Sequence, residues 1–346
     1  MSGKTFGPFN NIDISGSGIS FPRKRLSTEE ALNSVPIGQT MADKRRKFVA
    51  DSLNQKLGIQ HRHWSYTPGN PIAKDLNTAQ LASNALEKAM SSANLSAHQI
   101  ELLCVSTSTP HRYTGTIACT VGGNLGIKAP CVDIRSGCSS GFFALGQAAL
   151  QLQAGANHVA LVGSDTFSSV IPPNNRLALA IMGDGASALI LGKGTSTLHS
   201  VYFESDGSLS GMVETPGALP PSIEAIEQGQ YYLHGDINGF DQQISSLYQK
   251  AIQAVLHHAS MPSTQIDWFI PHQTSIPTAM TVASHFDIPA PKVWTKGIAR
   301  HANIGAGNWM AAIGSALREG DIQKGQTVLS AGVGGGMSWG AALWTF

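Results

Sequence analysis

A cysteine in a collar of small residues is the feature of this sequence that points most directly to chemistry. Cys138 stands in the run 135–141, Arg-Ser-Gly-Cys-Ser-Ser-Gly, which reads as a strand end, a tight turn and the start of a helix. The unpaired N–H groups and the dipole at a helix N-terminus stabilise a thiolate, and small neighbours let a substrate approach closely. The pattern therefore predicts that Cys138 is a nucleophile with a lowered thiol pKa. A lone cysteine is more often a small buried residue, which is how we interpret Cys104, Cys119 and Cys131.

A histidine and an asparagine later in the chain lie where comparable strands and turns are expected to end. His272 closes the apolar segment 267–272, and Asn303 lies in the turn 299–307, which is rich in alanine and glycine. Each has a structural alternative, because most of the twelve histidines are expected to be structural and an asparagine in such a turn often caps a helix. His301 is another candidate, ranked lower because it lies beside the turn and does not end a strand.

Glycine-rich segments supply two further signals of unequal weight. The run 332–336, Gly-Val-Gly-Gly-Gly, would let backbone N–H groups line a site, as an oxyanion hole for a thioester carbonyl requires. Taken alone, this run is a weak signal. Gly183-Asp184-Gly185 is predicted to be a hairpin turn, and a phosphate-binding loop is disfavoured because no Gly-Lys-Ser/Thr follows.

The elements that must position these residues occur twice in the chain. Residues 118–132 can be laid over residues 279–293 without a gap, and Ala, Thr, Val, Ile, Ala, Pro and Val recur at the same places. Helical segments are expected before these blocks, at about 78–94 and 242–260. Similar blocks in the same order indicate two copies of one mixed α/β unit, with parallel strands covered by helices. Chance similarity between Ala-rich helices is the alternative.

If the two copies pack face to face, the ends of their equivalent strands converge, which would bring the cysteine, the histidine and the asparagine together at a central crevice. No Pro-, Gly- or Ser-rich linker separates the copies, so we expect them to pack closely, with the join at about 192–199. The predicted division is residues 1–195 for the half with the cysteine and residues 196–346 for the half with the other two residues.

The overall composition excludes several classes of protein. Hydrophobic residues make up 42% of the 346 residues and charged residues only 13%, which suits a compact enzyme with an extensive subunit interface. The formal net charge of +1, without a long basic run, argues against nucleic-acid binding. No apolar run approaches the roughly 20 residues of a membrane span, the first residues lack a signal-peptide core, and the cysteines have no metal-binding spacing. The expectation is a soluble cytoplasmic enzyme without a metal.

In combination, these motifs resemble the β-ketoacyl synthase III branch of the thiolase-fold superfamily, from about residue 12 to the C-terminus. The segments that carry the resemblance are Ser136-Gly-Cys138-Ser, Val162-Gly-Ser-Asp165, Gly183-Asp-Gly-Ala186, Asp267-Trp-Phe-Ile-Pro-His272-Gln, Arg300-His-Ala-Asn303 and Gly334-Gly-Gly-Met-Ser-Trp-Gly340. The resemblance implies a five-layered αβαβα fold built from two duplicated halves, and a homodimer. It also implies Cys138, His272 and Asn303 as catalytic residues, with the N–H groups of Cys138 and Gly335 as the oxyanion hole.

The activity implied by the resemblance is a decarboxylative Claisen condensation. Cys138 would take an acyl group from a thioester, and the donor would be a malonyl-type or β-keto thioester. His272 and Asn303 would hydrogen-bond the thioester oxygen of a malonyl-type donor as carbon dioxide leaves. The carbanion would then attack the acyl-cysteine. No metal or redox cofactor is implied, and the partners would be thioesters of coenzyme A or of an acyl carrier protein.

Several positions depart from the pattern of the housekeeping members. Arg176 matches an arginine that contacts the coenzyme A nucleotide in the family, but Ser52 and Lys56 stand where many members have a Trp and an Arg. The helix expected after His272 carries no Lys or Arg for carrier docking. These departures favour a specialised condensing enzyme of secondary metabolism, with longer or β-keto acyl groups and ring closure as options. The alternatives are a non-condensing acyltransferase or thioesterase of the same fold, a housekeeping fatty-acid initiation enzyme, and a catalytically silent scaffold subunit.

Overall fold

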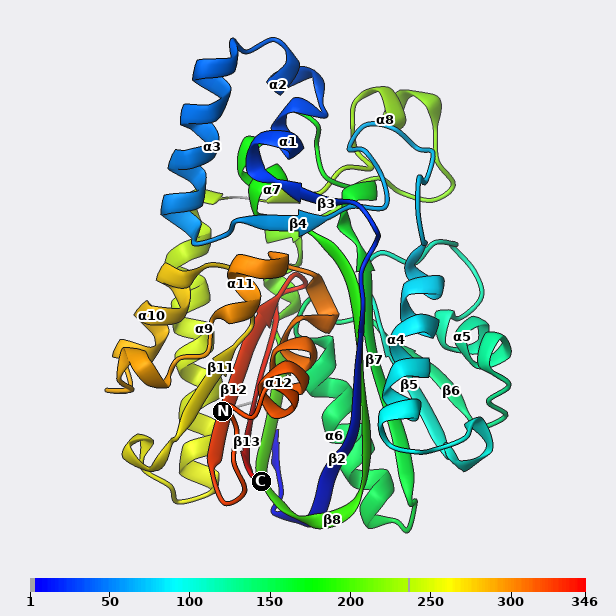
Figure 1. Ribbon diagram of the computed structural model, residues 1–346, viewed down its shortest axis with the longest axis vertical. Helices are drawn as coiled ribbons and strands as arrows, with labels where there is room; N and C mark the ends of the chain where they lie inside the picture. The colour runs from blue at the N-terminus through cyan, green and yellow to red at the C-terminus, as the bar shows by residue number, and fades with distance from the viewer. Residues whose placement is uncertain (1–3, 236) are drawn as a thin grey trace.

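One large mixed sheet organises the chain, which the computed structural model describes over residues 4–235 and 237–346. In this described part, nine strands form the sheet in the order β11-β12-β13-β8-β7-β5-β6, and β1 and β2 also pair with β8 (Figure 1). The strands are β1 (Lys4–Phe6), β2 (Phe9–Ser20), β5 (Leu102–Ser106), β6 (Cys131–Ile134), β7 (His158–Thr166), β8 (Asp184–Ser205), β11 (Trp268–Pro271), β12 (Thr327–Gly334) and β13 (Ser338–Thr345).

Strand β8 is the reason that both halves of the chain share one sheet. Its first part, residues 184–192, pairs antiparallel with β7, and its last part, residues 197–205, pairs antiparallel with β13. The strand continues without a break through the join expected at 192–199. The division into residues 1–195 and 196–346 stays a prediction.

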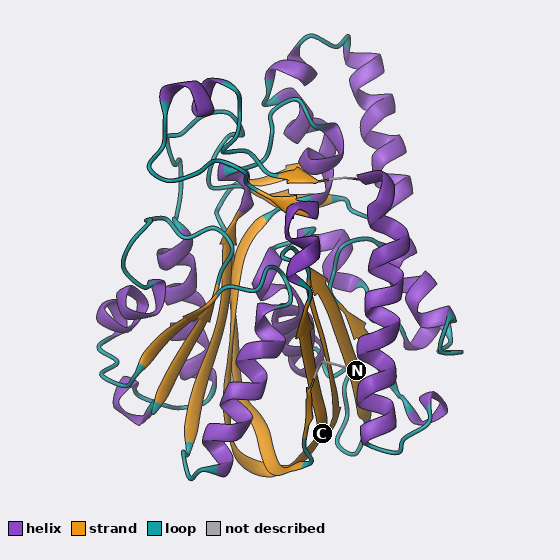
Figure 2. Cartoon of the chain, turned by 180° about the vertical axis from the view of Figure 1, so that it is seen from behind, coloured by secondary structure: helices purple, strands orange, loops and turns teal. Residues whose placement is uncertain are grey.

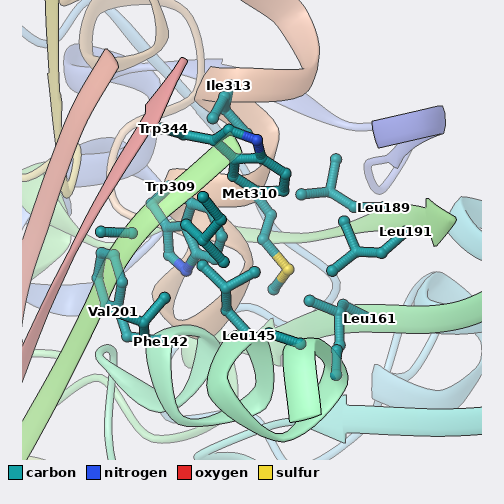
Figure 3. Packing of buried hydrophobic residues seen from close by; sticks show 14 of the residues in the cluster. Phe142, Leu145, Leu161, Leu189, Leu191, Val201, Trp309, Met310, Ile313 and Trp344 are labelled. Atoms are coloured by element: carbon teal, nitrogen blue, oxygen red, sulfur yellow. The ribbon is translucent and has the colours of Figure 1, made fainter. Parts of the chain in front are cut away.

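Two helices fill the space between the two parts of the sheet. They are α6 (Ser140–Gln153) and α12 (Asn308–Arg318), and residues of both join one core with β7, β8 and β13. Every residue of α12 from position 308 to position 316 is buried, as expected for a helix with apolar or small side chains on all sides. Figure 3 shows Phe142 of α6 beside Trp309 of α12, and their rings stack with centroids 4.9 Å apart.

Further helices cover the two outer faces of the sheet (Figures 1 and 2). Helices α4 (Thr78–Ser92) and α5 (Ile117–Leu125) pack on β5, β7 and the first part of β8. Helices α9 (Ile237–His258) and α10 (Ile276–Ser284) pack on β11, β12 and β13. The resulting layer order is α-β-α-β-α, which confirms the fold predicted from the sequence.

The elements recur in the order that the internal repeat predicts. Strands β5 and β7 are parallel neighbours and β7 is antiparallel to β8, and β11, β12 and β13 repeat this arrangement. The helices expected at 78–94 and 242–260 are α4 and α9. The two copies differ at β6, whose counterpart in the second half is an isolated bridge between Phe269 and Val293.

A smaller layer covers the end of the sheet where β7 finishes and β8 begins (Figure 1). Strand β3 pairs with β4 and strand β9 with β10, and short helices surround both pairs. The elements of this cap and of its border are β3 (Arg25–Ser27), α1 (Thr28–Asn33), α2 (Pro36–Gln39), α3 (Asp43–Leu57), β4 (His61–His63), α7 (Arg176–Ile181), β9 (Val213–Glu214), α8 (Ile223–Glu227), β10 (His234–Gly235) and α11 (Lys296–His301). Within the described residues, none of the helices has the length and apolar character needed to cross a membrane.

The hairpin turn predicted at Gly183-Asp184-Gly185 is wrong. Strand β8 starts at Asp184, and the chain reaches it from β7 through helix α7. The Asp184 carboxylate is buried and accepts hydrogen bonds from the backbone N–H groups of Ser65, at 2.6 Å, and Ser168, at 2.8 Å. The motif therefore ties the cap to the central sheet, since Ser65 follows β4.

Candidate active site

Cys138 lies in a tight turn that packs against a second stretch of glycine backbone. It precedes Ser139, the N-cap residue of α6, and follows Gly137, whose φ of +56° lies in the left-handed region that favours glycine. A Cβ atom on Gly334 would lie 2.4 Å from the Cys138 nitrogen, and one on Gly137 would lie 2.6 Å from the Gly335 nitrogen. Only glycine fits at these two positions. The segments that carry the Cys138 and Gly335 nitrogens are therefore in direct contact.

The thiol of Cys138 is protonated at neutral pH in this structure. Burial raises its pKa to about 12 and the nearby Asp165 carboxylate acts in the same direction, whereas hydrogen bonds from the Cys138 N–H and the Asn303 amide lower it. The lowered pKa expected from the sequence is therefore wrong for this state. Helix α6 begins two residues after the cysteine, and loss of water around a thiolate outweighs the stabilisation that these few N–H groups provide.

His272 is held by its backbone, while its ring has no hydrogen-bond partner. The residue directly follows β11, and its N–H donates to the Ala331 carbonyl of β12 at 2.8 Å. It is 3% exposed, and neither Nδ1 nor Nε2 has a partner among the described residues. Burial lowers the His272 pKa to about 4, so the ring is neutral at neutral pH and offers one donor and one acceptor. Two unpartnered ring nitrogens in a buried position are consistent with a ligand-binding role.

Asn303 is oriented by hydrogen bonds from its backbone and its side chain. Its N–H donates to the Ile181 carbonyl at 2.9 Å, and its own carbonyl accepts from the Gly183 N–H at 2.8 Å. Its Oδ1 accepts from the Gly305 N–H at 2.9 Å. The side-chain amide also hydrogen-bonds to Cys138, which lowers the thiol pKa. The structure thus brings the asparagine of the second half to the cysteine of the first.

The histidine lies close to helix α6, next to Gly332 of β12. A Cβ atom on Gly332 would lie 3.1 Å from the His272 Cβ and 3.0 Å from the ring of Phe142. Phe142 lies in the first turn of the helix that Cys138 precedes. The predicted catalytic residues and Gly335 are therefore carried by elements that pack together. His301, the alternative, is instead stacked on Phe21 at 4.2 Å.

Arg176 and Lys56 are not part of this cluster. Arg176 is the first residue of α7, and Lys56 lies in the last turn of α3, and both residues are exposed. Within the described part of the chain, neither side chain makes a hydrogen bond or an ion pair. They could meet only an extended part of a substrate outside the buried site. Among residues 4–235 and 237–346, no group of three or more His, Cys, Asp or Glu side chains is arranged to hold a metal ion.

Asp165, a buried residue for which the sequence predicted no role, connects two loops at the site. Asp165 Oδ1 accepts from the N–H groups of Ser108, at 2.7 Å, and Thr109, at 2.9 Å, and Oδ2 accepts from the Ala306 N–H at 2.9 Å. Burial raises the Asp165 pKa, and these hydrogen bonds oppose that shift. Asp165 therefore joins the loop after β5 to the turn after Asn303. The signal in the sequence that could have identified Asp165 is a charged residue inside an apolar strand pattern.

Two more residues that the sequence did not single out lie beside the site. Tyr248 of α9 is 2% exposed and its phenol interacts with Cys138 and with the Val333 N–H. Nothing marks it in the sequence, because a tyrosine on the apolar face of a helix looks like an ordinary core residue. Asn308 begins α12 and donates to Asn303 Oδ1 at 3.1 Å. A polar residue at the start of an otherwise apolar helix was the only indication.

Two family models match this chain. Residues 132–207 match the model of 3-oxoacyl-[acyl-carrier-protein] synthase III, and residues 256–346 match that of its C-terminal part. Cys138 lies in the first matched segment, and His272 and Asn303 lie in the second.

Solved structures of similar fold cover nearly the whole chain. The 3-oxoacyl-[acyl-carrier-protein] synthase III of Aquifex aeolicus VF5 is 23% identical with a TM-score of 0.82, and the match covers 98% of this chain and 100% of that one. The corresponding protein of Pseudomonas aeruginosa PAO1 is 24% identical with a TM-score of 0.83, covering 97% and 98%. The priming β-ketosynthase from the R1128 polyketide biosynthetic pathway is 20% identical with a TM-score of 0.83, covering 98% of each chain.

At these identities, likeness to the solved structures shows the fold alone. The family models add the relationship in sequence, and the segments they match contain the cysteine, the histidine and the asparagine that the fold brings together. The chain therefore has the fold of the β-ketoacyl-[acyl-carrier-protein] synthase III structures and matches the models of that family over residues 132–207 and 256–346.

Proposed function

We propose that this protein joins a Cys138-bound acyl group to a malonyl-type thioester by decarboxylative condensation, or to a β-keto thioester whose enolate forms by loss of an α proton to His272. The observation that carries the proposal is the grouping of a cysteine thiol, an unpartnered buried imidazole and an oriented asparagine amide beside the glycine backbone at 334–335. These are the groups needed to form an acyl-thioester and to stabilise an enolate.

In the first half-reaction, the sulfur of Cys138 attacks the thioester carbonyl, and the bond to the departing thiol breaks. Because the thiol pKa is raised and the His272 pKa is lowered, the resting pair is neutral and no preformed ion pair exists. The thiol proton therefore passes to His272 as the carbon–sulfur bond forms, and then to the departing thiolate. The N–H groups of Cys138 and Gly335 are the expected donors to the tetrahedral oxyanion.

In the second half-reaction, a malonyl-type thioester replaces the departed thiol. A ring N–H of neutral His272 and the amide N–H of Asn303 donate to its thioester oxygen, which gains negative charge as carbon dioxide leaves. The resulting carbanion attacks the acyl carbonyl on Cys138. The thiolate leaves and regains a proton, and a β-keto thioester is released.

Specialised metabolism is the proposed setting, because the protein surface departs from what a housekeeping enzyme needs. Helix α10 carries no charged residue, and Ser52 of α3 cannot stack on an adenine ring. The priming ketosynthase of a polyketide pathway has the same fold. Longer or β-keto acyl groups, with ring closure of the product, belong to the same proposal. A second copy of the chain is the proposed partner at β6, which ends the sheet order and exposes 41% of Val132.

The test separates the two half-reactions. Intact-protein mass spectrometry after incubation with a panel of acyl thioesters should show one acyl group on wild-type protein and none on Cys138→Ala. Release of labelled carbon dioxide from malonyl coenzyme A then reports the second half-reaction. Acyl loading without carbon dioxide release or condensation from any malonyl or β-keto thioester would favour the non-condensing acyltransferase or thioesterase. Absence of loading altogether would favour a silent scaffold subunit.

A further inference from the structure

Asn308 contacts both polar segments of the proposed site with one side chain. It is 3% exposed, and its Nδ2 donates to the Gln273 carbonyl at 2.9 Å and to Asn303 Oδ1 at 3.1 Å. Gln273 directly follows His272, and its own Nε2 donates to the carbonyls of Pro271, at 2.7 Å, and Trp294, at 3.2 Å. Asn308 therefore connects the segment at Gln273, which is held by these hydrogen bonds beside His272, to the side-chain amide of Asn303.

Two backbone groups decide which way both amides face. The Gln273 carbonyl can only accept a hydrogen bond, so Asn308 must turn its Nδ2 toward it. The Gly305 N–H can only donate, so it favours the orientation in which Asn303 Oδ1 faces it, at 2.9 Å, but it is only one of two donors to that oxygen. The second N–H of Asn308 then meets the same Oδ1. All three groups agree on one orientation, and the opposite orientation of Asn303 would lose both hydrogen bonds.

The consequence lies on the other side of the Asn303 amide. With both acceptor positions of Oδ1 occupied, the donor Nδ2 is left for the site, where the side chain hydrogen-bonds to Cys138. A freely turning amide would present its oxygen there part of the time. An oxygen in that place would repel the negative charge of an enolate instead of stabilising it.

We propose that Asn308 is a positioning residue that keeps the donor end of Asn303 turned toward the reacting thioester and sets its spacing from His272. The proposal rests on the function proposed above. Asn308 does not touch the reacting atoms, and it acts through Asn303. Its own geometry requires two N–H groups on one nitrogen, which serine, aspartate and alanine do not have.

The sharpest variant keeps the shape and reverses the polarity. In Asn308→Asp, a carboxylate that only accepts would face Asn303 Oδ1, so Asn303 should turn its N–H toward the new carboxylate and its oxygen toward the site. Alanine is less informative, because Asn308 borders a small internal cavity with Gln273 and His301, and a water molecule there could replace the lost donor. Asn308→Ser retains one donor and should behave between the wild type and Asn308→Asp.

The experiment measures carbon dioxide release from malonyl coenzyme A and, separately, loading of Cys138 from hexanoyl coenzyme A. Asn308→Asp should release carbon dioxide about a hundredfold more slowly, which is the loss typical of one missing oxyanion-type donor. Acyl loading should fall only several-fold, because it needs the Cys138 sulfur and no donor to an enolate oxygen. Lowering the pH should restore part of the release, because a protonated carboxyl can again donate to Asn303. Asn124→Asp is the matched control, since its Nδ2 donates to Ser83 Oγ at 3.0 Å far from the site.

A double variant distinguishes positioning from general damage. If Asn308 acts through Asn303, adding Asn308→Asp to Asn303→Ala should slow carbon dioxide release no further. Losses that multiply, equal loss in both half-reactions, or wild-type release by Asn308→Asp would each overturn the proposal.

A second measurement does not depend on condensation. A reversed Asn303 amide removes the donor that stabilises the Cys138 thiolate, so alkylation of Cys138 at pH 9 should be several-fold slower in folded Asn308→Asp than in the wild type. Unchanged alkylation would contradict the proposal for Asn308, whether or not the wild-type protein releases carbon dioxide. Absence of carbon dioxide release by the wild-type protein would instead count against the proposed function.

Discussion

The two halves of the chain contribute to the site in different ways. The first half presents Cys138 in a turn of backbone, where Gly137 packs against Gly334 and Gly335 of the second half and no side chain has room. The second half also presents side chains. One of them, Asn303, is held by hydrogen bonds, whereas the ring of His272 has no partner among the described residues. The nucleophile therefore needs close backbone packing, whereas the donors need a fixed orientation. The two half-reactions should then fail independently when one half or the other is altered.

The variant expected to show the largest difference between the two half-reactions is Asn303→Ala. The variant removes a donor that the enolate oxygen needs and leaves Cys138 and the glycine turn intact. Carbon dioxide release from malonyl coenzyme A should fall by about 10²–10³-fold, while acyl loading continues. Rates of release and of loading, measured on the same preparation, provide the check. Equal loss of both would mean that Asn303 is structural and that the comparison between the halves does not hold.

A second effect tests the neutral histidine of the second half through stability. His272 has a folded-state pKa of about 4 against an ordinary value of 6.5, so on acidification the unfolded chain takes up a proton before the folded chain does. The stabilisation is complete above pH 6.5 and is lost progressively as the pH falls toward 4. Between pH 7.5 and pH 4.5, wild-type protein should lose roughly 2–3 kcal/mol more unfolding free energy than His272→Asn.

Urea unfolding of both proteins at the two pH values measures this difference. His285 offers a matched control, because it is exposed, and His285→Asn should follow the wild-type pH dependence. The same dependence in His272→Asn and in the wild type would show that the His272 ring is solvated in solution.

Comparison of sequence and structure shows which properties are local. The residue types and the glycine turns at Cys138 and Asn303 could be read from short segments. The internal repeat predicted two α/β units with helices on parallel strands, and the family resemblance implied the five layers. The raised pKa of Cys138 could not be predicted from the sequence. It results from burial of the thiol, which depends on Gly334, a residue almost 200 positions away that packs against the turn. Asn308 escaped notice because its partners, Gln273 and Asn303, are identified only by contacts in space.

The same reasoning explains the error at the start of β8. Gly183-Asp184-Gly185 looks like a turn in the sequence, and only the pairing of Asp184 with Thr166 of β7 shows that it starts a strand. The join expected at 192–199 falls within β8, because one 22-residue strand serves both parts of the sheet.

A smaller effect concerns the reactivity of the four cysteines. Burial raises the pKa of both Cys138 and Cys104 to about 12. Cys119 is exposed, so its interpretation from the sequence as a buried residue is wrong. Since the thiolate is the reacting species, iodoacetamide at pH 8 should label Cys119 at least tenfold faster than Cys138. Peptide mapping of a labelling time course measures this order. Fastest labelling at Cys138 would indicate a more open site in solution, with the thiolate that the sequence pattern predicted.

The smallest effect concerns the carrier of the acyl group, and it compares the buried site with the surface around it. Lys56 and Arg176 are exposed and unpaired in the described structure, Ser52 offers no ring for stacking, and α10 carries no charge. The structure therefore contains the groups needed for the reaction, whereas the residues expected to bind a nucleotide offer few contacts. Short pantetheine thioesters should acylate Cys138 at rates within about tenfold of the matching coenzyme A thioesters.

Two variants test the charged residues at the surface. Lys56→Ala should have little effect on acylation by coenzyme A thioesters, and Arg176→Ala should weaken the contact with a nucleotide phosphate that Arg176 is expected to make. Acylation rates for the two thioester series, at low and moderate salt, measure the preference, since contacts between exposed charges are screened by salt. A preference for coenzyme A greater than about tenfold, which corresponds to roughly 1.4 kcal/mol, would mean that other residues recognise the nucleotide.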